Sequence, residues 1–259
     1  MVQSIPQLEK ECRVTRKEVL RMIARAGTSH IGSNLSAVEI GVVLNHLVGE
    51  NDEVVWSPGW KAALIYYLLH KRGVLPKDAI TKFPEPPYLG LAETEVPGVL
   101  CNGGSVGHGA SVATGVAYAK HKLGQPGHVW CVLSDGELNE GSTWEAFMFA
   151  GHHQLNQLTF VVDMNGIQAM GDTHNILNPE SLRKKAQAFR LSFSEVEDGN
   201  DIVAVKKILS SKVKEEPRFI QVWTTKGKGV SFMENDVAWH YRNVTEEDLE
   251  RALAELDHD

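Results

Sequence analysis

Apolar residues in the first part of the chain recur with the spacing of helices. Within the first twenty-six residues one predicted helix face carries Leu8, Cys12, Thr15, Val19, Met22, Ile23 and Ala26. Gly27 follows as a C-terminal cap. A second helix is predicted from Ser36 to about Val48, because Ser36 and Glu39 have the spacing of a capping box. Residues 60–71 predict a third helix.

Continuous apolar runs further along the chain predict buried strands. They cover residues 128–134, 158–163 and 218–224, and residues 53–56 predict a shorter strand. Helices are predicted over residues 107–123, from about Gly141, and after the cap at residues 245–248, whereas residues 84–105 predict a long loop. Apolar strands that alternate with helices are typical of an α/β fold, in which helices cover both faces of a mostly parallel sheet. The absence of repeats and linkers predicts one domain over residues 1–259.

Composition and charge exclude several classes of protein. The net charge of −7 argues against a nucleic-acid partner, because phosphate contacts need clustered Lys and Arg. Cys12, Cys101 and Cys131 are far apart and form no CxxC pair, so we expect reduced thiols and no zinc site. No run of eighteen apolar residues and no signal peptide is found, so we expect a cytoplasmic protein without a membrane partner.

Two of the predicted strands end at residues that can bind a metal ion. Asp135 follows the strand at residues 128–134, and Asn165 follows the strand at residues 158–163. If these strands are neighbours, both oxygens lie beyond the same edge of the sheet, where α/β proteins bind ligands. Such hard oxygen ligands suit Mg²⁺ or Ca²⁺ together with phosphate oxygens, and the helix that begins near Gly141 offers its N-terminus to a diphosphate. The spacing alone is equally consistent with an ordinary turn and a strand end.

Longer stretches around these residues closely resemble the thiamine diphosphate motif of transketolases. They are Ser134-Asp-Gly-Glu-Leu-Asn-Glu-Gly-Ser-Thr-Trp-Glu-Ala146, Ala150-Gly-His152 and Val162-Asp-Met-Asn-Gly-Ile167. Further matches are Gly103-Gly-Ser-Val-Gly-His-Gly109, Asp198-Gly-Asn-Asp201, Lys226-Gly-Lys-Gly-Val-Ser-Phe-Met-Glu-Asn235 and Trp239-His240. Ser134 stands where the family motif has its first glycine. The matches occur in family order over nearly the whole chain, which makes the resemblance specific.

The resemblance implies a role for individual residues. Asp135 and Asn165 are expected as side-chain metal ligands, with the carbonyl of Ile167 as the third protein ligand. Glu140 resembles the buried acid that couples the cofactor sites of paired subunits, and His30 and His240 resemble catalytic histidines of the cofactor and substrate channel. The expected cofactor contacts are Gly107, His108, Gly109, Asp135, Gly136, Glu137, Asn165, Ile167 and His240. Among these, Gly136 is expected to donate its amide to the diphosphate, and Gly107 and Gly109 suit a close backbone approach.

The resemblance also implies an activity and a partner. It implies the thiamine diphosphate-binding fold, and transfer of a two-carbon ketol unit from a ketose or ketose phosphate to an aldehyde through thiamine diphosphate and Mg²⁺ or Ca²⁺. Family chains continue with a pyrimidine-binding domain and a C-terminal domain. This chain resembles the N-terminal subunit of split transketolases, so we expect those domains on a separate C-terminal subunit. We expect an α2β2 heterotetramer that is active only when assembled.

Two departures from the family pattern favour a non-standard substrate. Gly59-Trp60 stands where the family usually has Gly-His, and Gly90-Leu91-Ala92 stands where it usually has Gly-His-Pro. Neither replacement can take up a proton. The same losses favour an inactive regulatory or scaffolding homologue, which the intact Asp135, Asn165 and Glu140 oppose. The α subunit of a 2-oxo acid dehydrogenase shares the diphosphate motif, but the stretch 226–235 argues against it.

Overall fold

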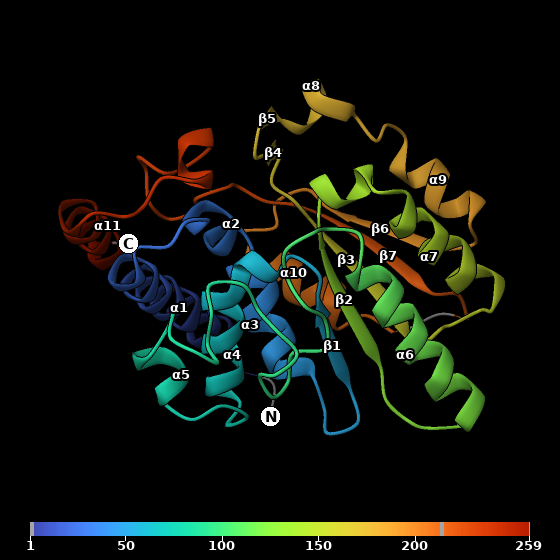
Figure 1. The fold of residues 1–259 in the computed structure, drawn as a ribbon. Coiled ribbons are helices and arrows are strands. Elements are labelled where there is room, and N and C mark those ends of the chain that lie inside the picture. Colours follow the sequence, from blue (N-terminus) through green and yellow to red (C-terminus); the bar gives the residue numbers. More distant parts are fainter. Residues whose placement is uncertain (1–2, 213–214, 259) are drawn as a thin grey trace.

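The computed structural model describes residues 3–212 and 215–258 and contains a five-stranded parallel sheet. Its order is β1-β2-β3-β7-β6 (Figure 1). The strands are β1 Glu53–Trp56, β2 Val129–Ser134, β3 Leu158–Met164, β7 Arg218–Trp223 and β6 Ser192–Val196. The parallel sheet and its first four strands were predicted, and the structure confirms them. The edge strand β6 was not predicted, because its alternating serines and a glutamate interrupt any apolar run.

Helices cover both faces of the sheet and bury two separate cores. On one face lie α1 Ile5–Ala26, α2 Ile31–Ser36, α3 Val38–Leu47, α4 Ala62–Lys71, α5 Asp78–Thr81, α10 Ile202–Leu209 and α11 Glu246–His258. On the other face lie α6 Gly109–Leu123, α7 Gly141–His152 and α9 Leu182–Ala188 (Figure 1). Val132 of β2 faces the first core and Leu133 faces the second. The two-sided burial explains why β2 and β3 are continuously apolar.

Shorter elements surround the carboxyl edge of the sheet. They are the 3₁₀ helices η1 Gly59–Lys61, η2 Gly136–Asn139 and η3 Val237–His240, the hairpin of β4 Ile167–Gln168 and β5 Gly171–Asp172, and the helix α8 Thr173–Leu177. β2 and β3 are neighbours, with Ser134 opposite Asp163, and the amide of Asp135 donates to the Asp163 carbonyl at 3.2 Å. The condition for a shared site at Asp135 and Asn165 is therefore met.

The predicted helix from Ser36 to Val48 is wrong at its start. α2 ends at Ser36, and α3 begins at Val38 without a side-chain cap. The Ser36 hydroxyl donates instead to buried Asp163 at 2.7 Å, and Glu39 pairs with Arg16 at 2.6 Å. Both side chains of the expected capping box are thus engaged by distant partners.

The other predicted helices are present. α1 confirms the first one, although residues 1 and 2 of that prediction lie outside the described residues. α4, α6 and α7 lie where they were predicted, and α11 begins with the expected mutual hydrogen bonds between Thr245 and Asp248. Within residues 3–212 and 215–258, no helix is long and apolar enough to cross a membrane.

Candidate active site

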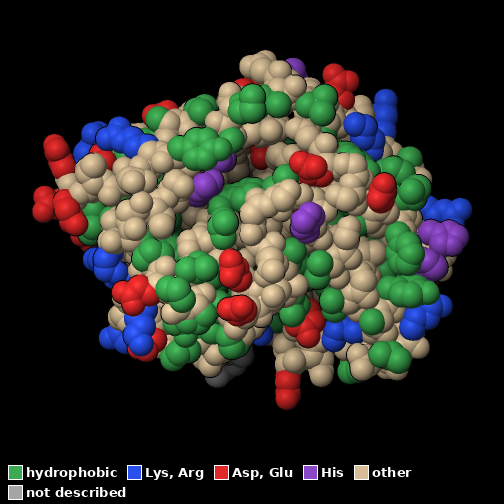
Figure 2. All heavy atoms as spheres, in the orientation of Figure 1, with side chains coloured by type: hydrophobic (Ala, Val, Ile, Leu, Met, Phe, Trp, Pro, Cys, Tyr) green, Lys and Arg blue, Asp and Glu red, His purple; other side chains and the backbone are tan. Residues whose placement is uncertain are grey.

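A cavity of about 390 Å³ lies at the carboxyl edge of the sheet. Its walls come from the segments after β2 and β3, from η1 and η3, and from residues 104–106. Figure 2 shows this face of the molecule hollowed in its upper half, with histidine side chains beside the hollow. The predicted site residues that line the cavity are His30, Asp135, Gly136, Glu140, Asn165, Ile167 and His240. The fold therefore brings together residues that are far apart in the sequence.

Asp135 follows β2 directly and is 2% exposed. Its Oδ1 accepts from the amide of Gly136 at 2.8 Å, while its Oδ2 accepts from the amide of Gly166 at 2.7 Å and from Thr173 Oγ1 at 3.0 Å. Burial, and after it the charge of Asp163, raises the pKa of Asp135 above its ordinary value. A divalent cation would favour the ionised carboxylate, so the environment of Asp135 is suited to a metal ligand. The Gly136 amide, expected to face a diphosphate, here serves Asp135.

Asn165 and Ile167 add neutral oxygens to the same cavity. Asn165 Nδ2 donates to Asp163 Oδ2 at 3.3 Å, and its Oδ1 accepts from the Ile167 amide at 3.3 Å. The Ile167 carbonyl accepts from Lys226 Nζ at 2.7 Å. In the part of the chain that the structure describes, no three His, Cys, Asp or Glu side chains form a metal site. A metal here therefore depends on amide and carbonyl oxygens beside Asp135, and such an all-oxygen set suits Mg²⁺ or Ca²⁺.

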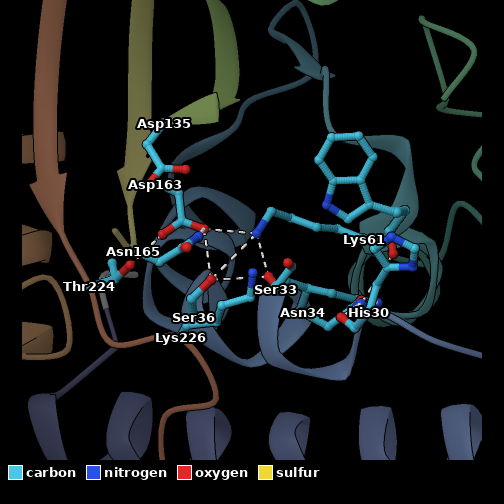
Figure 3. Close-up of polar contacts among 12 residues, drawn as sticks. His30, Ser33, Asn34, Ser36, Lys61, Asp135, Asp163, Asn165, Thr224 and Lys226 are labelled. Atoms are coloured by element: carbon cyan, nitrogen blue, oxygen red, sulfur yellow. Dashed lines mark hydrogen bonds and ion pairs between the residues drawn. The ribbon is translucent and has the colours of Figure 1, made fainter. Parts of the chain in front are cut away.

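A buried ion pair supports this edge of the site. Lys61 of η1 and Asp163 of β3 are both fully buried, with Nζ 2.7 Å from Oδ2 (Figure 3). Ser36 donates to the same carboxylate at 2.7 Å, Thr224 Oγ1 donates to its other oxygen, and Lys61 also donates to the Ser33 carbonyl. Burial alone would raise the pKa of Asp163, but Lys61 and these donors outweigh it and hold that pKa below its ordinary value. Sequence reasoning missed this pair, although a lysine in an apolar helical segment was a usable signal.

His30 and His240 lie in contact within the cavity. The His30 amide donates to the His240 carbonyl at 3.0 Å, and their ring centroids are 4.8 Å apart. His30 adopts a left-handed backbone with φ of 71°, a conformation that costs about 1–3 kcal/mol outside glycine and concentrates at functional sites. Burial, and after it the charge of Lys226, lowers the pKa of His30 to about 4 and that of His240 to about 3. Both imidazoles are therefore neutral at pH 7.

The two departures from the family pattern have different surroundings. Trp60 lines the cavity and stacks on His30 with ring centroids 5.9 Å apart. Leu91 is 40% exposed and is not part of the cavity wall, although the Ala92 amide donates to the Gly59 carbonyl at 2.9 Å and so joins the two segments. Trp60 therefore shapes the cavity directly, while Leu91 lies on the adjoining surface.

Four of the expected cofactor contacts lie outside the cavity wall. They are Gly107, His108, Gly109 and Glu137. Gly107 has φ of +86°, and a Cβ there would lie 2.8 Å from Glu140 Cβ; a Cβ on Gly109 would lie 2.3 Å from Ser57 Cβ. Glu137 is fully buried behind the loop and accepts from the Gly107 amide at 3.0 Å and from Ser57 Oγ. Because Gly107 and Gly109 have no side chain, the loop packs closely against Glu140 and Ser57 of the protein itself. Residues 104–106 of the same loop face the cavity.

Glu140 lies on the cavity wall at the start of α7. It is half-buried, and its side chain does not cap the helix. Its coupling role, expected at a contact between two subunits, stays a prediction.

Comparisons with known proteins agree with this geometry. The sequence matches the family described as transketolase, thiamine diphosphate binding domain, over residues 9–259. An apulose-4-phosphate transketolase subunit from Actinobacillus succinogenes is 34% identical, over 98% of this chain and 97% of that protein. The 6-deoxy-6-sulfo-D-fructose transketolase subunit SqwG of a Clostridium species is 31% identical, over 96% of each chain. The crystal structure of transketolase from Campylobacter jejuni matches 99% of this chain and 43% of its own, with a TM-score of 0.91 and 26% identity.

Proposed function

Because this chain belongs to the transketolase family of thiamine diphosphate-binding domains, we propose that it is the diphosphate-binding subunit of a split transketolase-like enzyme. That enzyme transfers a two-carbon ketol unit from a ketose phosphate to an aldehyde. The main observation in support of this function is that oxygens of Asp135, Asn165 and Ile167 share one cavity with His30 and His240. We also propose that residues 1–259 form a single domain.

The residues present fit the cofactor and its metal. Asp135, Asn165 and the Ile167 carbonyl would hold Mg²⁺ or Ca²⁺, and that ion would offset the negative charge of a diphosphate. Gly136 lies in the same wall and can offer its amide if Asp135 turns to a metal. When bound, thiamine diphosphate supplies the carbon nucleophile and electron sink for cleaving the donor's carbon–carbon bond.

The two histidines handle protons and orient the substrate. Because both are neutral at pH 7, each has one nitrogen that can donate and one that can accept. His30 Nδ1 is hydrogen-bonded to Ser29 Oγ at 2.7 Å, which leaves His30 Nε2 for a donor hydroxyl. Trp60 covers His30 and limits the access of water to it.

A separate protein with the pyrimidine-binding domain is the second part of the proposal. Two relatives of matching length are themselves named as transketolase subunits, which supports a partner for this chain. The outer side of α7 exposes Met148 and Phe149 at 54% and 41%, on the helix that begins beside Glu140. We propose an α2β2 heterotetramer in which α7 and Glu140 lie at an interface between subunits that is large and apolar.

The donor is proposed to be a modified ketose. Trp60 places a bulky, non-titrating ring where the family usually has histidine, so an ordinary pentose phosphate loses a group that can accept its hydroxyl proton. The names of the relatives, which mention apulose 4-phosphate and 6-deoxy-6-sulfo-D-fructose, are consistent with a family branch that uses unusual ketoses.

The decisive experiment compares the chain alone with the assembled enzyme. The chain is purified and assayed with thiamine diphosphate, Mg²⁺ and a panel of ketose donors, then assayed again with a separate subunit that carries the pyrimidine-binding domain. We expect no ketol transfer by the chain alone, because the resemblance to transketolases implies that the carboxylic acid that activates the cofactor's aminopyrimidine ring lies on the partner's pyrimidine-binding domain. Substantial activity without a partner would refute the split-enzyme proposal. Cofactor binding by an assembly without any turnover would favour the inactive homologue.

A further inference from the structure

Lys226 is a fully buried lysine without a carboxylate partner among the described residues. Its Nζ donates to the Ile167 carbonyl at 2.7 Å and lies 2.8 Å from His240 Nδ1. It therefore joins an expected metal ligand to a histidine of the cavity. Among the described residues Lys226 forms no salt bridge, and its side chain is not exposed to solvent. The hydrogen bond to His240 is therefore the contact through which Lys226 can act on the cavity.

The position of Lys226 is held firmly by its surroundings. Its carbonyl accepts from the Asn235 amide at 2.9 Å, and the next amide, of Gly227, donates to the Gly32 carbonyl at 3.0 Å. A Cβ on Gly32 would lie 3.1 Å from Lys226 Cγ, so the lysine stem packs directly against α2. With both its backbone and its stem fixed, the ammonium group cannot move far from the His240 ring.

An ammonium group only donates hydrogen bonds, so the nitrogen that faces it must accept. Turning the His240 ring over would place a C–H against the ammonium and leave a buried donor unpaired, which costs free energy. Lys226 Nζ donates to the Ile167 carbonyl on one side and faces His240 Nδ1 on the other. A neutral imidazole has only one ring proton, so a donor at Nδ1 leaves that proton on Nε2.

We propose that Lys226 is a positioning residue that fixes His240 as the Nε2–H tautomer, so that His240 presents a hydrogen-bond donor to the cavity. His240 then stabilises negative charge on a bound oxygen, and the task of accepting a proton is left to His30. This division of roles rests on the proposed function, whereas the tautomer itself does not.

The test is the protonation pattern of His240 in the full chain at pH 7. The chain is labelled with ¹⁵N-histidine, two-bond ¹H–¹⁵N correlations are recorded, and the His240 signals are identified by their loss in His240→Gln. We expect the proton on Nε2, with the Nε2–H form favoured roughly tenfold or more by one charge-assisted hydrogen bond. In Lys226→Met, which lacks the donor, the preference for Nε2–H should fall by at least about threefold and the two nitrogen shifts should move towards each other.

Lys228→Met is the matched control, because Lys228 lies two residues away with a side chain that is 40% exposed and pairs with Glu234. It should leave the His240 pattern unchanged. A wild-type spectrum with the proton on Nδ1 overturns the proposal, as does an unchanged pattern in folded Lys226→Met. A wild-type proton on Nδ1 is decisive against the proposal even if Lys226→Met fails to fold, and a wild-type Nε2–H preference well below about tenfold also counts against it. No cofactor, substrate or partner is present, so the result is independent of whether the assembled enzyme transfers ketol units.

Discussion

Removing one charge from the Lys61–Asp163 pair should destabilise the fold strongly. Removing both charges should cost much less stability than the two single losses added together. Both side chains are 0% exposed, and Nζ lies 2.7 Å from Oδ2. In Lys61→Met the carboxylate of Asp163 keeps its hydrogen bonds from Ser36 and Thr224 but loses its counter-charge. In Asp163→Asn the buried ammonium of Lys61 loses its partner.

Breaking a buried pair by removing one partner costs roughly 3–5 kcal/mol, because the other charge stays desolvated. Each single variant should lose about that much out of a total stability of about 5–15 kcal/mol. In Lys61→Met/Asp163→Asn no buried charge is left over. The double variant should therefore retain at least about 2 kcal/mol more stability than the two single losses predict when added.

The assay is equilibrium unfolding in urea, monitored by circular dichroism, for the four proteins of the cycle. Lys82→Met is the matched control, because Lys82 pairs with Asp78 at 2.6 Å while both side chains are more than half exposed. It should cost far less stability than either single variant of the buried pair, because solvent screens an exposed pair. Two results would contradict this reasoning: Lys61→Met loses no more stability than Lys82→Met, or the losses of the two single variants add up to the loss of the double variant. The buried pair would then not couple the two charges energetically.

Four further predictions concern the cavity and the residues around it. Asp135→Ala should abolish metal-dependent binding of thiamine diphosphate in calorimetry while circular dichroism shows an intact fold, and wild-type affinity in this variant would remove Asp135 from the metal site. The assembled enzyme should turn over xylulose 5-phosphate weakly, because of Trp60 and Leu91, and steady-state rates of about 10 per second would contradict this. Leu91→His should raise that rate, and an unchanged rate would contradict a role of Leu91 in the choice of donor. The pKa of His30 is about 4 and that of His240 about 3, below the ordinary value of 6.5, so the unfolded chain binds more protons in this range. The melting temperature should consequently fall as pH drops from about 6.5 towards 4, and His30→Gln should fall less steeply; equal slopes would contradict the assigned pKa of His30.

Local sequence patterns determined the central sheet and the first outline of the site. The runs at residues 129–134 and 158–164 are apolar because both faces of these strands are buried, so the sequence pattern alone reveals them. Asp135 and Asn165 could be chosen because a metal ligand at the end of such a strand has a position that the strand itself defines. The resemblance to transketolases could also be found in the sequence, because the family motif occupies the ends of these two strands.

Tertiary structure alone decided which distant groups meet. Lys61 reaches Asp163 across 102 residues, and Ser36 leaves the expected capping box for the same carboxylate across 127 residues. The edge strand β6 forms by pairing with β7, without an apolar run of its own. Leu91 and Trp60 are equivalent departures from the family pattern in the sequence, yet only Trp60 lines the cavity. Periodicity along a chain reports how deeply a residue is buried, but the partner of a buried charge depends on how separate elements pack, and no local pattern carries that information.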